Sequence, residues 1–157
     1  MSRRGLITMS DAEVRAFLEG SKTIIINSNG PGGYPHPMPM WFGLDPDGSV
    51  RMTTFRASQK VKNLQRDPRV SLLAESGEEY AQLMGVVLYG RAQLVDDIDF
   101  VTKTLISVAT RSQAPPDEAT RDGMAKVMAK TAAKRIGILV KPERVVSWDH
   151  RKLGGTY

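Results

Sequence analysis

The clearest pattern in the chain is an alternation of apolar and polar positions between Met84 and Val95, which is typical of a β-strand with one buried face. A β-branched run at 23–27 predicts a strand that is buried on both faces. Other short apolar or alternating runs predict strands at 50–55, 70–74, 135–140 and 145–148. Most of the regular structure is therefore expected to be β.

Helical patterns are confined to short segments. Ser10 and Glu13 have the spacing of a capping box, so the first helix is expected over about 10–20. The other helices are expected at Ser58–Arg66, after the cap residue Asp96 and, beyond the break at Pro115-Pro116, around Met124 and Met128. These helices are too few to build a core alone and are expected to flank the strands.

The segment 34–43 is extended but contains three prolines, Pro35, Pro37 and Pro39. Proline has no N–H for a sheet ladder, so this strand is expected at an edge or with a bulge. A tight turn follows at 45–48. Short strands joined by turns predict a small antiparallel barrel, mainly β with flanking helices, in one domain that spans residues 1–157.

The composition excludes several classes of protein. The 157-residue chain has no cysteine and two histidines, so disulfides are impossible and a metal site is not expected. No apolar run of a signal peptide follows the N-terminus. The longest apolar stretch, Met84–Leu88, is far too short to span a bilayer. We therefore expect a cytoplasmic protein without a membrane partner.

The formal net charge is +5, and most of it lies in one window. Residues 56–69 include five lysines or arginines and one aspartate. A helix that begins at Ser58 has unpaired N–H groups at its positive end, and Lys60 can add a full charge there. Lys62 and Arg66 share another face, where they could hold a second anion. This pattern fits a phosphate site; the alternative is a solvated basic face, which most charge runs represent.

Several motifs occur in a recognisable order. They are Pro37-Met38-Pro39-Met40-Trp41-Phe42, the turn Asp45-Pro46-Asp47-Gly48, the strand end Thr53-Thr54-Phe55, the block Ser58-x-Lys60-x-x-Asn63-Leu64-x-Arg66-Asp67-Pro68-Arg69-Val70, and the ending Ser147-Trp148-Asp149-His150-Arg151-Lys152-Leu153-Gly154-Gly155-Thr156-Tyr157. Together they resemble the pyridoxamine 5′-phosphate oxidase-like superfamily and, more narrowly, its branch that uses the deazaflavin coenzyme F420. Each motif alone is weak, but the resemblance covers nearly the whole chain.

The resemblance implies a six-stranded antiparallel split β-barrel that forms an intimate homodimer, with two cofactor sites at the subunit interface. In the family, residues matching Ser58 and Lys60 bind the cofactor phosphate. The strand matching 53–55 follows the ribityl chain, the segment matching 38–41 lies beside the ring, and the ending of the partner subunit closes the site. The candidate cofactor-binding residues are therefore Met38, Pro39, Met40, Trp41, Thr53, Thr54, Phe55, Arg56, Ser58, Lys60, Lys62, Asn63, Trp148 and Arg151.

The basic residues favour F420 over FMN. FMN has one phosphate, whereas F420 also carries a phosphodiester and an oligoglutamate tail, which would suit Arg56, Lys62 and Arg66. Arg69 is expected to serve the turn after the helix instead. The predicted function is F420-dependent hydride transfer to an electron-poor small molecule. The alternatives are an FMN-dependent oxidoreductase of the same fold and a carrier protein that binds the cofactor without turnover.

No side chain is expected to act as a nucleophile, because no Ser-His-Asp arrangement is recognisable and the cofactor carries the chemistry. His36 is expected to be structural or to lie at the rim of the substrate pocket, and His150 either touches substrate or lies on the surface. Trp41 and Trp148 are more often core or interface residues than stacking partners. A nucleic-acid partner is not expected, because the basic residues lack an interleaved aromatic platform.

Overall fold

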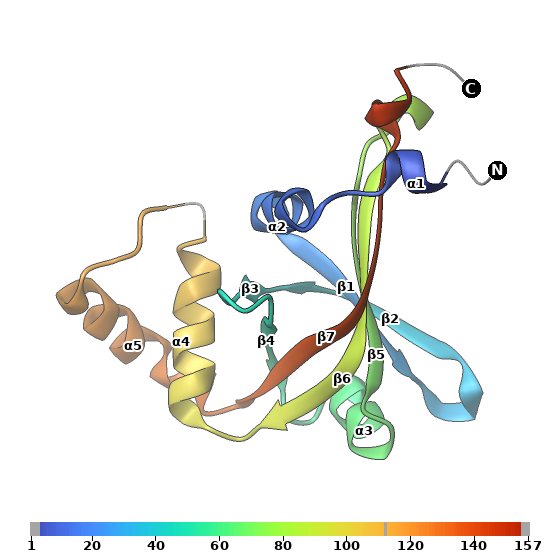
Figure 1. The fold of residues 1–157 in the computed structure, drawn as a ribbon. Coiled ribbons are helices and arrows are strands. Elements are labelled where there is room, and N and C mark those ends of the chain that lie inside the picture. Colours follow the sequence, from blue (N-terminus) through green and yellow to red (C-terminus); the bar gives the residue numbers. More distant parts are fainter. Residues whose placement is uncertain (1–3, 112, 155–157) are drawn as a thin grey trace.

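The centre of the fold is a seven-stranded antiparallel sheet with the strand order β2-β1-β5-β6-β7-β4-β3, seen in a computed structural model that describes residues 4–111 and 113–154 (Figure 1). The strands are β1 (Thr23–Asn29), β2 (Pro35–Trp41), β3 (Gly43–Leu44), β4 (Val50–Phe55), β5 (Arg69–Ser76), β6 (Met84–Val95) and β7 (Arg135–Asp149). The α-helices are α1 (Arg4–Ile7), α2 (Asp11–Gly20), α3 (Gln59–Arg66), α4 (Ile98–Ala109) and α5 (Glu118–Ala132). Short 3₁₀ turns lie at Pro31–Gly33, Tyr80–Gln82 and His150–Leu153.

The connection through Phe42 requires this sheet to curl. β2 and β3 are the two edge strands, yet only Phe42 separates the end of β2 from the start of β3. A single intervening residue spans about 7 Å, which is less than two strand spacings. The two edges therefore meet at Phe42, whose side chain is fully buried. This confirms the expected split barrel, in which the two-residue β3 adds a seventh strand to the predicted six.

The proline-rich strand lies at an edge, as predicted. β2 pairs with β1 over its whole length, from Pro35 opposite Asn29 to Trp41 opposite Thr23. The prolines occupy every second position, so they all face the same way. Because a proline nitrogen cannot donate to a ladder, the pairing is continuous only if these nitrogens face away from β1. The outer edge of β2 consequently lacks three of its hydrogen-bond donors.

β7 differs from the prediction of two separate strands. It is one strand of 15 residues that pairs with β6 from Gly137 to Asp149. The register shifts at Tyr89 and Gly90, where Gly90 lies opposite Pro142. A Cβ on Gly90 would lie 2.4 Å from the carbonyl oxygen of Lys141, so the close strand approach there requires glycine. The bulge accommodates Pro142, so β7 continues through the segment between the two predicted strands.

The helix starts follow their caps, with one correction. Ser10 and Glu13 form the reciprocal capping box predicted for α2. The N-cap of α4 is Asp97, whose carboxylate accepts from the Phe100 N–H, whereas Asp96 had been predicted. Either aspartate suits a cap chemically, and their adjacency made the choice ambiguous. Asp96 instead accepts a hydrogen bond from the Arg56 guanidinium.

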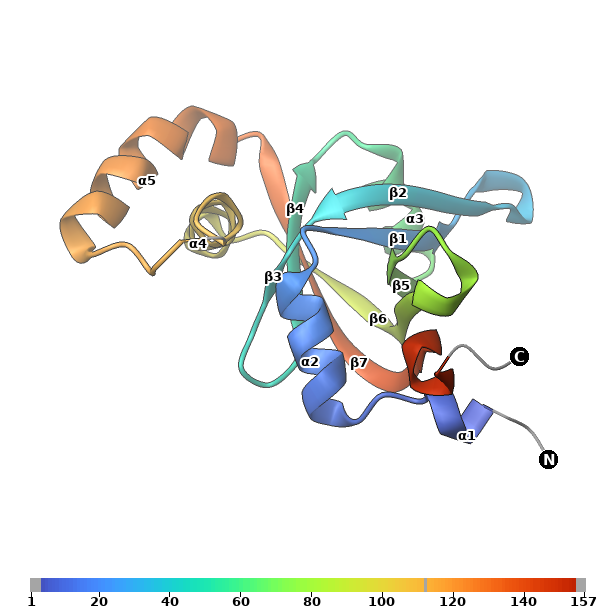
Figure 2. The same ribbon diagram turned by 90° about the horizontal axis from the view of Figure 1, so that it is seen from above.

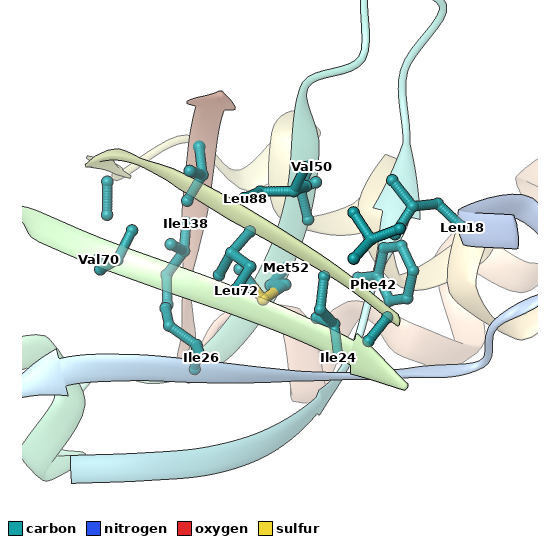
Figure 3. Close-up of a cluster of buried hydrophobic side chains, with 14 of the residues drawn as sticks. Leu18, Ile24, Ile26, Phe42, Val50, Met52, Val70, Leu72, Leu88 and Ile138 are labelled. Atoms are coloured by element: carbon teal, nitrogen blue, oxygen red, sulfur yellow. The ribbon is translucent and has the colours of Figure 1, made fainter. Parts of the chain in front are cut away.

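The inward faces of the strands form one core. Ile24, Ile26, Met52, Leu72 and Ile138 come from four strands and have no more than 1% of their surface exposed (Figure 3). The helices cover different parts of the barrel. α3 lies at one end, α2 lies across the sheet near β3, and α4 and α5 project together to one side (Figure 2). No helix among the described residues is long and apolar enough to cross a membrane.

Candidate functional site

Lys60, in the first turn of α3, is a buried cation without an acidic partner. Its exposed fraction is 8%, and its ammonium donates to the Thr54 hydroxyl at 3.1 Å. No carboxylate of the described residues lies within 4.0 Å of that ammonium. Burial lowers the Lys60 pKa, and the nearby charge of Arg135 lowers it further. A desolvated charge without a counter-ion is unfavourable in the protein alone, so this position favours binding of an anion.

The N-terminus of α3 is open beside this lysine. Ser58 occupies the N-cap position, but its side chain makes no capping hydrogen bond. Its hydroxyl instead lies 3.2 Å from the hydroxyl of Thr54. The two hydroxyls and the ammonium of Lys60 therefore form one chain of polar groups. The helix end remains available for the negative charge that its dipole favours.

Arg135 is a second cation at this position, and the sequence analysis did not identify it. It begins β7 and lies opposite Phe55 of β4. Its guanidinium lies 4.5 Å from the centre of the Phe55 ring, and Nη1 donates to the carbonyl and the hydroxyl of Thr53 at 3.4 and 3.3 Å. Its Nε is buried without a hydrogen-bond partner. Only the pairing of β4 with β7 brings Arg135 here, so no local sequence signal could have identified it.

A pocket of about 400 Å³ gathers several of the expected residues. Pro39, Met40 and Trp41 from the end of β2 form one wall, and Thr53 lies on β4. The remaining lining residues are Thr23, Leu105, Val108 and Arg135. This volume lies within the range of sites for small molecules. The segment at 39–41 and the strand at 53–55, which are distant in sequence, thus meet at one cavity.

The exposure of Trp41 distinguishes it from a core residue. Its side chain is 70% exposed although it lines the pocket, and Phe55 nearby is 52% exposed. Met38 and Met40 share the other face of β2 and both pack against the core, but only Met40 also lines the pocket. Of the predicted ring segment, therefore, residues 39–41 reach the pocket and Met38 does not.

Thr53 and Thr54 separate the pocket from the lysine. Consecutive residues of a strand point to opposite faces, so Thr53 faces the pocket and Thr54 faces Lys60. Ser58, Thr54 and Lys60 do not line the pocket itself. The pocket lining at Thr53 and the polar residues around Lys60 both lie near the end of β4. Arg135 is close enough for its charge to act on Lys60. A ligand that contacts both groups must therefore pass around this strand end.

Arg56 and Asn63 are placed differently from expectation. The Arg56 guanidinium donates to the Asp96 carboxylate at 2.6 Å and lowers the pKa of that carboxyl, so the charge of Arg56 is compensated. Asn63 is fully buried and donates to the Ser28 hydroxyl at 3.0 Å while accepting from Gln59 at 2.9 Å. Asn63 therefore fixes α3 to β1 and cannot contact a ligand without displacement of the helix.

The remaining basic residues of the window have separate surroundings. Lys62 is exposed and has no ion pair within the described residues. Arg66 donates to the backbone carbonyl of Asn29. Arg69 pairs with Asp67 at 2.7 Å and lowers its pKa, which confirms that Arg69 serves the turn after the helix. The uncompensated charge of this surface is smaller than the sequence window indicated.

Trp148 and Arg151 lie at the opposite end of β7 from Arg135. About 40 Å of strand separates Arg135 from Trp148 at roughly 3.3 Å per residue. Figure 1 shows β7 running from the region of α3 and α4 to the C-terminal turn at the far end. Arg151 pairs there with the buried carboxylate of Asp149 at 2.8 Å. Neither residue lines the pocket.

The two histidines are also outside the pocket. The His150 ring is bonded to the carbonyl of Tyr80 at 3.0 Å and lies 4.5 Å from the Tyr80 ring. His36 lies on β2 opposite Ser28 and has a buried Nδ1 without a partner. Within residues 4–111 and 113–154, no cluster of three acidic or histidine side chains could hold a metal ion. The last three residues of the sequence motif, 155–157, lie outside the described part.

Solved structures with this fold differ widely in their sequence identity to this chain. The conserved hypothetical protein Rv2991 from Mycobacterium tuberculosis is 36% identical, with all of this chain and 95% of that chain covered and a TM-score of 0.85. A putative 5-nitroimidazole antibiotic resistance protein from Bacteroides thetaiotaomicron is 13% identical over 90% of this chain and 85% of that chain, with a TM-score of 0.72. An F420 reductase is 20% identical over 83% and 94% of the two chains, with a TM-score of 0.59.

The family is established by a match over most of the length. A comparison with curated proteins found no significant match. The model of the pyridoxamine 5′-phosphate oxidase family, however, matches residues 10–148. That range includes all seven strands except the last residue of β7, and it contains both the pocket and Lys60. The chain belongs to the pyridoxamine 5′-phosphate oxidase family.

Proposed function

We propose that this protein is a homodimeric oxidoreductase that uses F420 to reduce an electron-poor small molecule. The observation that carries the proposal is the buried, unpaired ammonium of Lys60 beside an open helix N-terminus and near Arg135. Two cations without a contacting carboxylate favour a phosphate. The fold is shared with an F420 reductase, and that likeness supports the choice of cofactor class.

The residues present fit such a cofactor at two points. Lys60 and Ser58 would hold the phosphate, which requires the ammonium to turn from Thr54 toward the strand end. Arg135 would contribute charge from the pocket side. Pro39, Met40 and Trp41 would lie against the ring in the cavity, where Trp41 offers a large apolar surface. When bound, reduced deazaflavin supplies a hydride to the substrate, and these residues orient the ring and limit access of water.

The proposed second subunit would supply what one protomer lacks. Trp148 and Arg151 are too far along β7 to close their own pocket. Two aromatic side chains are exposed, Trp41 at the end of β2 and Phe55 at the end of β4. Exposed apolar surface of this kind marks interaction sites. We infer that a second copy covers these side chains and places its own C-terminal segment over the pocket.

FMN remains the alternative cofactor for this fold. One phosphate would be held by Lys60, Ser58 and the helix end without any contribution from Lys62 or Arg66. F420 is favoured because Lys62 is exposed and uncompensated, and because the surface pair between Arg56 and Asp96 is weak enough for a polyanion to displace. A carrier that binds F420 without turnover would use the same residues.

Fluorescence titration of the purified protein with F420 and with FMN tests the proposal. We expect saturable F420 binding that is tighter than FMN binding, and a loss of affinity in Lys60→Ala. Lys126→Ala, an exposed lysine of α5, is the matched control and should leave the affinity unchanged. Single-turnover oxidation of bound reduced F420 by an electron-poor enone or nitro compound then separates an enzyme from a carrier. Tighter binding of FMN than of F420 would overturn the choice of cofactor.

A further inference from the structure

A second cavity is larger than the pocket that Trp41 and Thr53 line. A cleft of about 810 Å³ lies on the other side of α4, with Lys103, Ile106, Ser107 and Thr110 on its wall. Leu105 and Val108 of the same helix face the proposed ring pocket instead. The other walls are β3 and β4, the end of α2, the α4–α5 connection and α5. The two cavities therefore lie against different faces of α4.

The charge of this cleft is strongly positive. Its lining includes the cations Arg51, Lys103, Arg111 and Arg121 and a single acid, Glu19. Glu19 is already paired with Arg15 at 2.8 Å. Arg51 is compensated by Asp45 at 2.8 Å, and Arg121 lies near enough to Asp117 to lower the pKa of that carboxyl. Lys103 has no ion pair within the described residues.

Arg111 is the most unusual of the four cations. Its guanidinium donates to the backbone carbonyls of Phe42 and Leu18 and lies 3.8 Å from the centre of the Phe42 ring. No described carboxylate bonds to it; burial lowers its pKa, and the nearby charge of Glu19 partly opposes this shift. A guanidinium has five N–H donors, and these two bonds use one from each terminal nitrogen. It is thus a fixed, partly desolvated charge with donors remaining at the cleft wall.

We propose that this cleft binds a small organic molecule with at least two negative charges and an apolar body. The charges would meet Lys103, Arg111 and Arg121, which come from three consecutive parts of the chain. Leu44, Ile106 and the two prolines of the connection provide apolar surface for the body of the ligand. The volume lies within the range of small-molecule sites. The site requires no cofactor and stands independently of the F420 proposal.

Two aromatic dianions test this inference, since carboxylate and phosphate can both satisfy the cations. Isophthalate and phenyl phosphate are titrated into ¹⁵N-labelled protein, with neutral isophthalamide as the control ligand. We expect saturable shifts of the backbone amides near Lys103, Arg111 and Arg121 with at least one dianion and none with the amide. The relative affinities of the two probes identify the preferred anionic group. Shifts confined to residues near Trp41 and Lys60 would overturn the inference.

Substitutions at exposed positions keep this test interpretable. Arg111 holds two backbone carbonyls, so its removal risks unfolding. The double change Lys103→Gln and Arg121→Gln should instead weaken binding by about 2- to 30-fold. Lys126→Gln with Lys130→Gln, two α5 lysines outside the cleft, is the matched control and should have no effect. Equal weakening by both pairs, or no saturable binding in the millimolar range, would overturn the site. Amide shifts near Lys60 and shifts near the cleft are fitted separately, because the proposed phosphate site can also bind phenyl phosphate.

Discussion

Thr53 and Thr54 are neighbours in β4, but a different cation holds each hydroxyl. Nη1 of Arg135 lies 3.3 Å from the Thr53 hydroxyl, and Nζ of Lys60 lies 3.1 Å from the Thr54 hydroxyl. Alternation along the strand places these contacts on opposite faces. The end of β4 therefore carries positive charge on both sides, and no described carboxylate pairs with either cation. This arrangement is unfavourable for the isolated protein and favourable for an anionic ligand.

Lys60→Met should therefore improve stability and impair binding. Methionine fills similar space without a charge to desolvate, so the unfolding free energy of the ligand-free protein should rise by about 1–3 kcal/mol. Cofactor affinity should fall by about 10- to 100-fold through loss of a charge-assisted contact. Urea unfolding and fluorescence titration measure the two effects. Lys62→Met, at an exposed position, is the control for stability. A destabilised Lys60→Met protein would contradict the view that Lys60 is held for binding.

The pH dependence of this difference has a definite sign. Because the pKa of Lys60 is lowered in the folded protein, the unfolded chain binds more protons in the alkaline range. The wild-type protein should thus gain stability relative to Lys60→Met as pH rises toward the ordinary lysine pKa of about 10.4. Below the folded-state pKa the difference should be constant. Urea unfolding of both proteins between neutral and alkaline pH measures the stability advantage of Lys60→Met over the wild type. This advantage should shrink as pH rises, and an advantage that grows with pH would contradict the prediction.

The C-terminal end of the sheet offers a test based on a close contact. A Cβ on Gly85 would lie 2.1 Å from Cζ2 of Trp148, which is opposite it in the β6–β7 ladder. Gly85→Ala should displace the indole and reduce the unfolding free energy by about 1–3 kcal/mol. In a Trp148→Ala background the same change should cost less, which a double-mutant cycle measures. Gly123→Ala in α5, where nothing lies within 4 Å, is the control and should be neutral or stabilising. Additive effects of the two substitutions would contradict the contact.

Much of the fold could be predicted because its determinants are local. The capping box of α2 and the alternation of β6 are each contained in one short segment, and both were confirmed. The prolines of β2 constrained that strand to an edge through backbone chemistry alone. β7 was divided in the prediction because Pro142 interrupts the pattern. Its continuity depends on a bulge opposite Gly90, which is a property of the pair of strands.

The candidate site was harder to predict, because its electrostatics depend on distant residues. Asp96 compensates Arg56 across 40 positions of sequence, so the charge of the basic window could not be read from the window itself. Arg135 reaches the site only because β7 pairs with β4. Asn63 has the motif spacing of a ligand-binding residue, yet its side chain is bonded inside the protein. The position of Lys60 was predictable because helix geometry alone brings it to the N-terminus of α3.

Mixing two defective variants tests whether a site takes residues from both subunits. Lys60→Ala removes the proposed phosphate anchor, and Arg151→Ala alters the proposed closing segment. If each site uses Lys60 of one protomer and Arg151 of the other, a heterodimer has one site with both defects and one intact site. Refolding the two variants together should then restore high-affinity F420 binding that neither shows alone, as fluorescence titration would report. Mixed protein without recovered affinity, although dimeric by light scattering, would contradict a shared site.

The surface pair formed by Arg56 and Asp96 lies where an oligoglutamate tail is proposed to bind. Their side chains are 44% and 67% exposed, so the pair contributes little to stability. Asp96 nevertheless competes with any polyanion for Arg56. Asp96→Asn should free this charge and strengthen binding of long-tailed F420 by up to about fivefold. Asp99→Asn, an exposed aspartate in the first turn of α4, is the matched control and should have a smaller effect.

A double substitution distinguishes binding of the oligoglutamate tail from binding of the phosphate. The double change Lys62→Ala and Arg56→Ala should weaken long-tailed F420 more than a tail-free analogue, because both side chains flank the phosphate site without belonging to it. FMN affinity should barely change, since Lys60, Ser58 and the helix end hold its phosphate. The gap between tailed and tail-free ligands should shrink at high salt, where exposed charges are screened. If tailed and tail-free ligands lose affinity equally, the basic surface acts on the phosphate or on folding. The electrostatic argument for F420 over FMN would then fail, and only the family resemblance would support it.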